Sequence, residues 1–293
     1  MIVVAGSTGV LGLEVCRRLR QKGKAVRALV RATSNPDRVA ALKAAGCETV
    51  VGNLRDRKSL DAACRGASVV ISTVTSVTTA KEGDSIAGTD SEGNRNLVDA
   101  AVAAKAGQFI FVSFDATGVP DCPLVDAKQE VEDHLRKSGL TWTILQPGYF
   151  MESWLGPMLF ADPAAGTARF YGSADISARY IAVSDVAEVV AQCVDNPKAK
   201  NRVIQFGGPE ELSQAEALRR FEKAFGRSFS VTTVPSEALE AQWKSAEDPV
   251  MRSFSALMLG LSRRAISVPP LPAEFPVKMK TVDEFVRELG GRA

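Results

Sequence analysis

The sequence has a single histidine, no paired cysteine motif and no dominant charge. Its 293 residues include five cysteines, which are scattered and contain no Cys-x-x-Cys pair. We therefore expect reduced thiols and no metal site. The 36 basic residues nearly balance the 34 acidic ones, and the formal net charge is +2. This charge gives no indication of a dedicated binder of nucleic acid or of anionic membranes.

Long apolar runs are also missing. No stretch reaches the roughly 18 apolar residues that a membrane-spanning helix needs, and no basic segment precedes the opening apolar run Ile2 to Ala5. We expect a cytoplasmic protein that does not associate with membranes. With 45% hydrophobic and 24% charged residues, the chain is typical of a globular protein with one large domain or two unequal ones.

The first half of the sequence alternates short apolar runs with amphipathic segments, which is typical of βαβ units and a parallel sheet. The predicted strands are Ile2 to Ala5, Ala25 to Val30, Thr49 to Val51, Ser68 to Ser72, Phe109 to Val112 and Thr143 to Leu145. The predicted helices are Val10 to Gln21, Pro36 to Ala45, Lys58 to Cys64, Gly93 to Ala104 and Leu124 to Lys137. Six strands and five crossovers predict an α/β fold with a doubly wound parallel sheet of the Rossmann type.

Most of these helices are followed by a glycine, which suits a left-handed C-cap. These glycines are Gly23, Gly46, Gly66, Gly107 and Gly139.

The alternation stops after Pro147-Gly148, where aromatic residues become denser. We predict a dinucleotide-binding domain over 1–147, to which 184–207 returns with a helix and the strand Val203 to Phe206. Residues 148–183 and 208–293 would form a smaller, mostly helical lobe for the substrate. Capping boxes at Ser213-x-x-Glu216 and Thr281-x-x-Glu284 predict helices in this lobe, and the Pro-rich stretch Val268 to Pro276 is interpreted as a surface connection.

A glycine-rich turn joins the first predicted strand to the first predicted helix. Gly6 permits a tight turn, Gly9 lets the backbone approach a pyrophosphate, and Gly12 lets helix and strand pack closely. The N-terminus of the helix offers unpaired N–H groups to the anion. The alternative is a strand-to-helix turn that binds nothing. The predicted pyrophosphate-binding residues are Gly6, Ser7, Thr8, Gly9, Val10, Leu11 and Gly12.

The end of the second predicted strand indicates which dinucleotide binds. NAD sites usually carry an acidic residue there, which binds the ribose 2′-hydroxyl, whereas this strand ends in Arg31, and we expect no carboxylate to be placed where it would repel a 2′-phosphate. An arginine suits the 2′-phosphate of NADP, so we expect NADP(H) rather than NAD. Arg27 is a second candidate for this contact, and the alternative for Arg31 is a solvated loop residue.

The sequence resembles the NmrA-like branch of the atypical short-chain dehydrogenases/reductases, which includes isoflavone reductase-like enzymes and NADPH-dependent quinone reductases. The matching segments are Gly6-x-x-Gly9-x-x-Gly12, Val26 to Arg31, Gly52-Asn53-Leu54-x-Asp56, Phe111-Val112-Ser113, Lys128-x-x-Val131-Glu132, Gly139 to Glu152 and Ile181-x-Val183-x-Asp185-Val186-Ala187. The resemblance implies that Asn53 and Leu54 border the adenine and that Ser72 and Thr73 lie along the cofactor. It also implies that Pro147, Gly148, Tyr149 and Phe150 face the nicotinamide.

The sequence departs from this branch at two positions. Asn53 stands where the branch commonly has Asp, and Gln146 stands where it commonly has Arg.

Ordinary short-chain dehydrogenases use the tyrosine of a Tyr-x-x-x-Lys motif as acid or base, and this sequence has no such motif. Lys128 lies on the same face of its predicted helix as Leu124, Val131 and Leu135, so the face expected to be buried carries one cation. We predict that Lys128 binds the nicotinamide ribose and can donate a proton to the acceptor; the alternative is an edge lysine whose ammonium reaches solvent. Ser113 is the second catalytic candidate because it could hold the acceptor oxygen, or it could merely cap backbone groups.

These features favour an NADPH-dependent oxidoreductase that transfers hydride to a small aromatic, quinone-like or carbonyl acceptor. A second hypothesis is a non-catalytic redox-sensing regulator that binds NADP(H) and acts through protein partners, since the usual tyrosine is absent. An epimerase or dehydratase acting on a nucleotide-linked sugar is disfavoured for the same reason. His134 is predicted to be a solvated surface residue rather than part of a catalytic triad.

Overall fold

The computed structural model describes residues 1–77, 83–263 and 268–291. The chain divides into two compact units. The first unit comprises Met1–Ser113, Asp126–Gln146 and Val186–Ile204, and the second comprises Phe114–Val125, Pro147–Asp185 and Gln205–Ala293. The predicted substrate lobe over 148–183 and 208–293 stays a prediction about function, and residues 114–125 group with the second unit.

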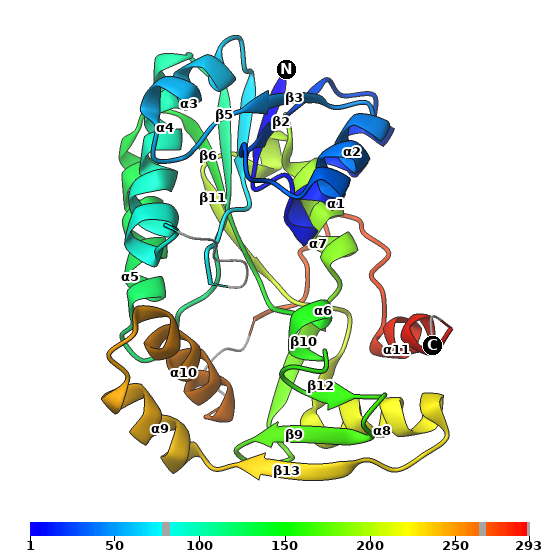
Figure 1. The fold of residues 1–293 in the computed structure, drawn as a ribbon. Helices are drawn as coiled ribbons and strands as arrows, with labels where there is room; N and C mark the ends of the chain where they lie inside the picture. Colours follow the sequence, from blue (N-terminus) through cyan, green and yellow to red (C-terminus); the bar gives the residue numbers. More distant parts are fainter. Residues whose placement is uncertain (78–82, 264–267, 292–293) are drawn as a thin grey trace. The chain divides into compact units, whose positions relative to one another are not determined.

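The first unit is built on a seven-stranded sheet in the order β11-β6-β5-β4-β1-β2-β3 (Figure 1). Its strands from β1 to β6 pair in parallel. The strands are β1 (Ile2–Ala5), β2 (Val26–Val30), β3 (Glu48–Val51), β4 (Val69–Ser72), β5 (Gln108–Val112), β6 (Thr141–Pro147) and β11 (Arg202–Phe206). Every predicted strand is present, and the doubly wound α/β fold is confirmed.

Helices cover both faces of this sheet, with α3, α4 and α5 on one face and α1, α2 and α7 on the other (Figure 1). Their bounds are α1 (Val10–Gln21), α2 (Pro36–Ala44), α3 (Arg57–Cys64), α4 (Asn94–Ala103), α5 (Pro123–Lys137) and α7 (Val183–Cys193). A π-helix, η1 (Ile86–Gly93), leads into α4, and a short 3-10 helix, η2 (Pro197–Ala199), follows α7. Because both faces are covered, β1, β4 and β5 are buried along their whole length.

The strand order reverses between β1 and β4, which are neighbours in the sheet although they are separated by β2 and β3 in sequence. Ligands of doubly wound sheets bind beyond the carboxyl ends of the strands at such a reversal. Gly6 follows β1 and Thr73 follows β4, so these two residues mark the expected position of the ligand in the first unit.

Four of the five predicted glycine caps have the left-handed backbone, whereas the prediction for Gly107 is wrong. After α4 it is Lys105 that turns left-handed, with φ of 54°. The Lys105 N–H donates to the Val102 carbonyl, and the Ala106 N–H donates to the Ala101 carbonyl. This pairing already closes the helix, so Gly107 is free to continue toward β5.

The second unit contains two three-stranded sheets, β12-β10-β7 and β13-β9-β8. The strands are β7 (Tyr149–Phe150), β8 (Ala161–Asp162), β9 (Thr167–Tyr171), β10 (Ser177–Ile181), β12 (Glu211–Ser213) and β13 (Ser230–Val234). The helices are α6 (Met151–Trp154), α8 (Gln214–Phe225), α9 (Ser236–Ser245), α10 (Pro249–Ser262) and α11 (Val282–Gly290). The helices were predicted in outline, whereas the short strands of this unit were not.

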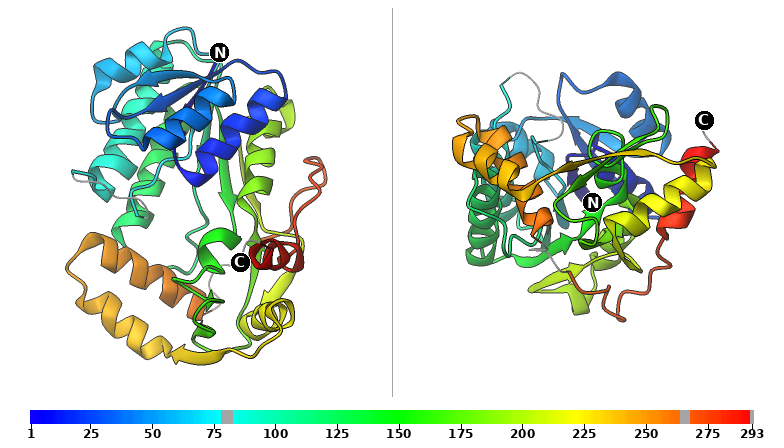
Figure 2. Two further views of the ribbon diagram at one scale, coloured as in Figure 1. Left: turned by 45° about the vertical axis from the view of Figure 1, so that its right-hand side comes forward. Right: turned by 90° about the horizontal axis from the view of Figure 1, so that it is seen from below.

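Both predicted capping boxes are present, at the start of α8 and of α11. These two helices pack against each other (yellow and red in Figure 2), and an ion pair between Arg220 and Asp283 joins them. The interpretation of Val268 to Pro276 as a surface connection is wrong in part, because Val268 and Phe275 are buried. Their apolar side chains anchor the stretch to the second unit.

Candidate functional site

The turn between β1 and α1 is held in a shape that only glycine permits. Gly6 has φ of 76°, and its carbonyl accepts a hydrogen bond from the Gly9 N–H at 2.9 Å. A Cβ at Gly12 would lie 2.1 Å from the Gly6 oxygen, and a Cβ at Gly6 would lie 2.6 Å from Thr73 Oγ1. A side chain at either position would therefore push the turn away from the helix or from the end of β4.

The N-terminus of α1 is open to an anion. Gly9 occupies the N-cap, and no side chain among the described residues caps the helix. Val10 is 54% exposed although it is apolar, as expected of a residue that a ligand would cover. The first turn of α1 can therefore hold a pyrophosphate by its backbone N–H groups.

Ser7 has a different environment from its neighbours in the turn. Its side chain is fully buried, and its hydroxyl donates to the Leu29 carbonyl at 2.7 Å. This bond ties the turn to β2, so only the backbone of Ser7 is available to a ligand. Leu11 is also buried, whereas Thr8 and Gly9 are partly exposed.

The two arginines of β2 have separate roles. Arg27 pairs with Glu48 and donates to the carbonyls of Ala63 and Arg65, so it serves the packing of β3 and α3. Arg31 Nη1 lies 2.9 and 2.7 Å from the two carboxylate oxygens of Asp84. The expectation that no carboxylate lies near Arg31 is therefore wrong: Asp84 arrives from the segment that precedes η1.

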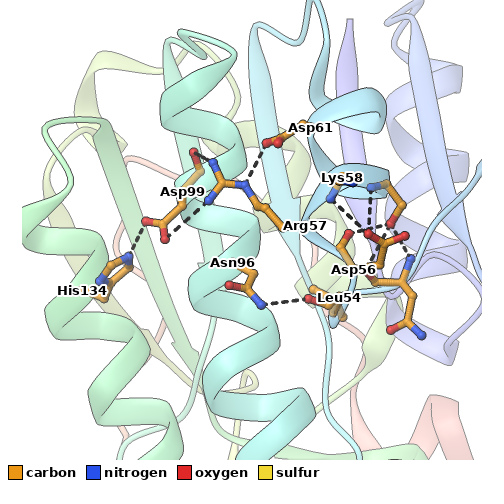
Figure 3. A network of polar contacts seen from close by, with 10 residues as sticks. Leu54, Asp56, Arg57, Lys58, Asp61, Asn96, Asp99 and His134 are labelled. Atoms are coloured by element: carbon orange, nitrogen blue, oxygen red, sulfur yellow. Dashed lines mark hydrogen bonds and ion pairs between the residues drawn. The ribbon is translucent and has the colours of Figure 1, made fainter.

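Asn53 and Leu54 lie beyond the end of β3. The Asn53 side chain accepts from the Arg55 N–H at 3.1 Å and so stabilises its own turn. The Leu54 carbonyl accepts from the Asn96 side-chain amide at 3.2 Å, which fixes this turn to α4 (Figure 3). The asparagine at position 53 thus supports this turn with its own side chain.

The end of β4 carries two hydroxyls with local partners. Ser72 is fully buried and donates to the Asn94 side chain at 2.5 Å, while Thr73 Oγ1 donates to the Ala5 carbonyl at 3.1 Å. Asn94 in turn donates to the Asp90 carbonyl at 2.9 Å. These bonds join β1, β4, η1 and α4 at the reversal of strand order.

Lys128 lies buried on α5, on the face that the sequence predicted. Its ammonium donates to the Val74 carbonyl at 3.0 Å and lies 5.1 Å from the centroid of the Phe111 ring. Only 7% of the residue is exposed. Burial lowers the pKa of Lys128 from its ordinary value of 10.5, and the charges of Asp90 and Glu132 oppose this shift. The alternative of an edge lysine whose ammonium reaches solvent is excluded by this burial.

Asp90 is a site residue that sequence reasoning missed. It lies on the π-helix η1, is fully buried, and has one carboxylate oxygen 3.7 Å from the Lys128 ammonium. The other oxygen accepts from the Ser76 N–H at 2.9 Å and from the Ser76 hydroxyl at 2.6 Å. The available signal was indirect: a buried lysine needs a buried counter-charge. Single-turn π-helices are also frequent at functional sites.

Two buried oxygens in this region have no hydrogen-bond partner among the described residues: Asp90 Oδ1 and Ser113 Oγ. Ser113 follows β5 and lies two residues after Phe111, so the alternation of the strand places both side chains on the same face. Because Phe111 lies beneath the Lys128 ammonium, we infer that Ser113 faces the same region. A ligand with polar atoms could satisfy both oxygens.

Gln146, where the branch commonly has an arginine, donates to Glu132 at 2.9 Å. The other oxygen of the buried Glu132 carboxylate accepts from Arg136 at 2.8 Å. Glu132 is therefore contacted by a cation from α5 itself and by a neutral donor from the end of β6.

Pro147, Gly148, Tyr149 and Phe150 belong to the second unit. The Gly148 N–H donates to the Phe206 carbonyl at 2.8 Å, and a Cβ at Gly148 would lie 2.7 Å from the Arg179 oxygen. Tyr149 is buried, with its ring 4.6 Å from the Trp154 ring in an edge-on contact. Burial raises the pKa of Tyr149, and the neighbouring Tyr180 raises it further. Tyr149 is thus a poor acid or base.

The prediction that His134 is a solvated residue is wrong in part. Its Nε2 lies 2.6 Å from an Asp99 oxygen, and the side chain is 36% exposed. Asp99 also faces Arg57, which pairs with Asp61 (Figure 3). The histidine belongs to a polar network that joins α3, α4 and α5.

The described ranges contain no cluster of three His, Cys, Asp or Glu side chains that could hold a metal ion. In the same ranges no helix is long and apolar enough to cross a membrane.

Comparison with known proteins places the chain in a family. The sequence profile of the NmrA-like family matches residues 1–259. Over 241 residues the chain is 31% identical to the photosystem II assembly factor Ycf39 of Cyanophora paradoxa, covering 82% of this chain and 73% of the relative. Over 242 residues it is 30% identical to the NAD(P)H azoreductase of Xenophilus azovorans, covering 81% and 78%.

A solved structure of similar fold is the NADPH-dependent quinone oxidoreductase of Escherichia coli complexed with NADPH. The TM-score is 0.78 at 23% sequence identity, with 99% of both chains covered. The resemblance found in the sequence is thereby confirmed: the chain belongs to the NmrA-like family.

Proposed function

We propose that the protein is an NADPH-dependent oxidoreductase that transfers hydride to a small aromatic, quinone-like or carbonyl acceptor. The observation that carries this proposal is the glycine turn after β1. It leaves the N-terminus of α1 uncapped at the reversal of strand order, and it excludes side chains at Gly6 and Gly12. The azoreductase and the quinone oxidoreductase to which the chain is similar support it, since their names give electron-poor acceptors and a nicotinamide cofactor.

The proposal assigns residues of the first unit to the cofactor part by part. The turn would hold the pyrophosphate, Arg31 the 2′-phosphate, and Asn53 with Leu54 the edge of the adenine. Thr73 would lie along the cofactor, while the buried Ser72 hydroxyl keeps its bond to Asn94. We further propose that Pro147, Gly148, Tyr149 and Phe150 border the nicotinamide through their backbone and ring surfaces. When bound, the reduced nicotinamide supplies the hydride.

Lys128 would serve the reacting end of the site. Its ammonium has three donors and uses one on Val74, so the others can bind the nicotinamide ribose and the acceptor oxygen. Because burial lowers its pKa, the ammonium gives up a proton more readily than an exposed lysine does. The acceptor carbon gains the hydride and its oxygen gains the proton from Lys128 or water. The unpartnered Ser113 hydroxyl can hold that oxygen.

The first test is turnover. Purified protein is mixed with NADPH and a panel of quinones, aromatic enones and aldehydes, and the loss of reduced-nicotinamide absorbance is followed together with direct binding of NADPH. The proposal predicts saturable binding and turnover with at least one acceptor class. Failure to bind NADPH would overturn it.

The second test distinguishes a specific role of Lys128 from a general effect of replacing a lysine on α5. Lys128→Met is compared with Lys137→Met, which removes an exposed lysine from the same helix. We expect Lys128→Met to lower kcat by about 100-fold, and the pH dependence of kcat should lose the step that is due to the lysine ammonium. We expect Lys137→Met to have no effect. Full turnover and unchanged NADPH affinity in Lys128→Met would remove Lys128 from the mechanism.

A second candidate function is a non-catalytic NADP(H)-binding regulator. It is favoured by the absence of a Tyr-x-x-x-Lys motif and by the similarity to a relative named as an assembly factor. Tight NADPH binding without turnover on any acceptor would favour this function over the reductase.

A further inference from the structure

The anion nearest to Arg31 comes from within the chain. Arg31 directly follows β2, and its Nη1 contacts both carboxylate oxygens of Asp84, at 2.9 and 2.7 Å. The Asp84 side chain is only 8% exposed, whereas the Arg31 side chain is 36% exposed. The Asp84 carboxylate is therefore paired with the Arg31 guanidinium and largely shielded from water.

A second arginine holds the same segment. Arg55, in the turn after β3, donates to the Gly83 carbonyl at 2.7 Å, and a Cβ at Gly83 would lie 3.2 Å from Arg55 Nη2. Gly83 and Asp84 are thus bound by two cations, one directly after β2 and one in the turn after β3, and these two strands are neighbours in the sheet. Arg31 contacts the Asp84 carboxylate and Arg55 contacts the backbone beside it, and a guanidinium such as that of Arg31 also suits an anion with more charge than a carboxylate, such as a phosphate.

This arrangement combines the two ways in which dinucleotide-binding sites recognise the 2′-position of the adenosine ribose. In NAD sites a carboxylate after β2 accepts hydrogen bonds from the 2′-hydroxyl, and in NADP sites an arginine near that position accommodates the 2′-phosphate. Here Arg31 occupies the position after β2, and Asp84 brings a carboxylate to it from the segment that follows β4.

We propose that Arg31 and Asp84 together determine cofactor specificity, with Asp84 acting as an internal competitor of the 2′-phosphate. This inference rests on the proposed dinucleotide-binding function and extends it to the adenosine end. NADPH must displace Asp84 from Arg31, because two anions cannot share the guanidinium without repulsion. NADH carries no 2′-phosphate, so Asp84 can stay in place and accept from the 2′-hydroxyl.

The consequence is that wild-type protein binds both cofactors and prefers NADPH less than the arginine alone would allow. Asp84→Asn removes the competing charge and also weakens the bond to the 2′-hydroxyl of NADH. A charged hydrogen bond contributes enough that its exchange changes affinity by about tenfold. We therefore expect the ratio of NADPH affinity to NADH affinity to rise by about tenfold in Asp84→Asn.

Arg31→Ala is the opposite perturbation, and we expect it to lower that ratio by about tenfold or more, because it removes the partner of the 2′-phosphate. Asp37→Asn is the matched control. Asp37 is an exposed acid in the first turn of α2, a few residues after Arg31, and its loss removes one negative charge close by. The affinity ratio of this control should equal that of the wild type.

The experiment is a calorimetric titration of NADPH and of NADH into the wild type and the three variants at one salt concentration. Opposite shifts in Asp84→Asn and Arg31→Ala, with no shift in Asp37→Asn, support the proposal. An unchanged or lowered ratio in Asp84→Asn, with binding of both cofactors intact, overturns it and leaves the proposed function standing. If the wild type binds neither cofactor, the proposed function fails and this inference fails with it.

Discussion

Replacing Asp90 by asparagine removes the charge that faces the buried Lys128 ammonium. The two groups lie 3.7 Å apart, Asp90 is fully buried, and Lys128 is 7% exposed. At the effective dielectric constant of about 20 that suits such sites, two unit charges at this distance attract by about 4 kcal/mol. Losing one member of a buried pair leaves the other charge without compensation, so we expect Asp90→Asn to lower the free energy of unfolding by about 3 kcal/mol.

In Lys128→Met the Asp90 carboxylate likewise loses its counter-charge and, among the described residues, keeps the two hydrogen bonds from Ser76. The double variant leaves neither charge buried without its partner. Its cost should therefore be smaller than the sum of the two single costs by about 2 kcal/mol, which is a coupling typical of residues in contact.

The effect of Asp90→Asn should also depend on pH. The pKa of Lys128 is lowered in the folded protein by burial, so the unfolded chain holds the proton up to a higher pH than the folded chain does. Stability due to this group therefore rises with pH between the two pKa values. Removing Asp90 lowers the folded pKa further, so the penalty is largest at low pH and disappears once pH exceeds the wild-type folded pKa.

Urea unfolding of the wild type, both single variants and the double variant, at about pH 7 and at about pH 10.5, which lies above the lowered pKa of Lys128, measures both effects. The loss in Asp90→Asn should be smaller at the higher pH. The reasoning is refuted if the single costs add to the double cost within about 0.5 kcal/mol, or if the loss in Asp90→Asn is the same at both pH values.

Three further perturbations test other parts of the account. A Cβ at Gly12 would lie 2.1 Å from the Gly6 oxygen, so Gly12→Ala should weaken NADPH binding at least tenfold and lower stability by about 2 kcal/mol, as calorimetry and urea unfolding would show. Burial raises the pKa of Glu152 above 4.5, although its carboxylate accepts a hydrogen bond from the Val183 N–H. The stability due to this group therefore falls as pH rises above 4.5. Glu152→Gln should stabilise the protein at about pH 7 and not at about pH 4. Thr281→Ala removes the side-chain cap of α11 and should cost about 1 kcal/mol, whereas Thr281→Ser should restore most of it.

The features that sequence reasoning predicted well are local. The glycine turn, the strands of the first unit and the buried face that carries Lys128 each follow from the spacing of residues within about one helix or strand. The prediction of a cap at Gly107 was wrong because a residue other than glycine can adopt the left-handed conformation that closes a helix. Lys105 took that role two residues earlier.

The features that sequence reasoning missed depend on contacts between distant segments. Asp84 meets Arg31 across 53 positions, and Asp90 meets Lys128 through a π-helix whose bulge no simple periodicity reveals. Both acids lie between β4 and α4, a segment that shows no strand or helix pattern of its own. The strands of the second unit escaped because several of them are only two or three residues long.

The most direct test of the central claim is amide hydrogen exchange of the wild-type protein with and without saturating NADPH. If the glycine turn and the N-terminus of α1 hold the pyrophosphate, peptides covering residues 6–13 should exchange more slowly with NADPH present. Peptides covering α8, to which no site residue is assigned, should remain unchanged and serve as the internal control. Binding of NADPH that protects only peptides elsewhere, and leaves residues 6–13 as fast as in the free protein, would contradict the account.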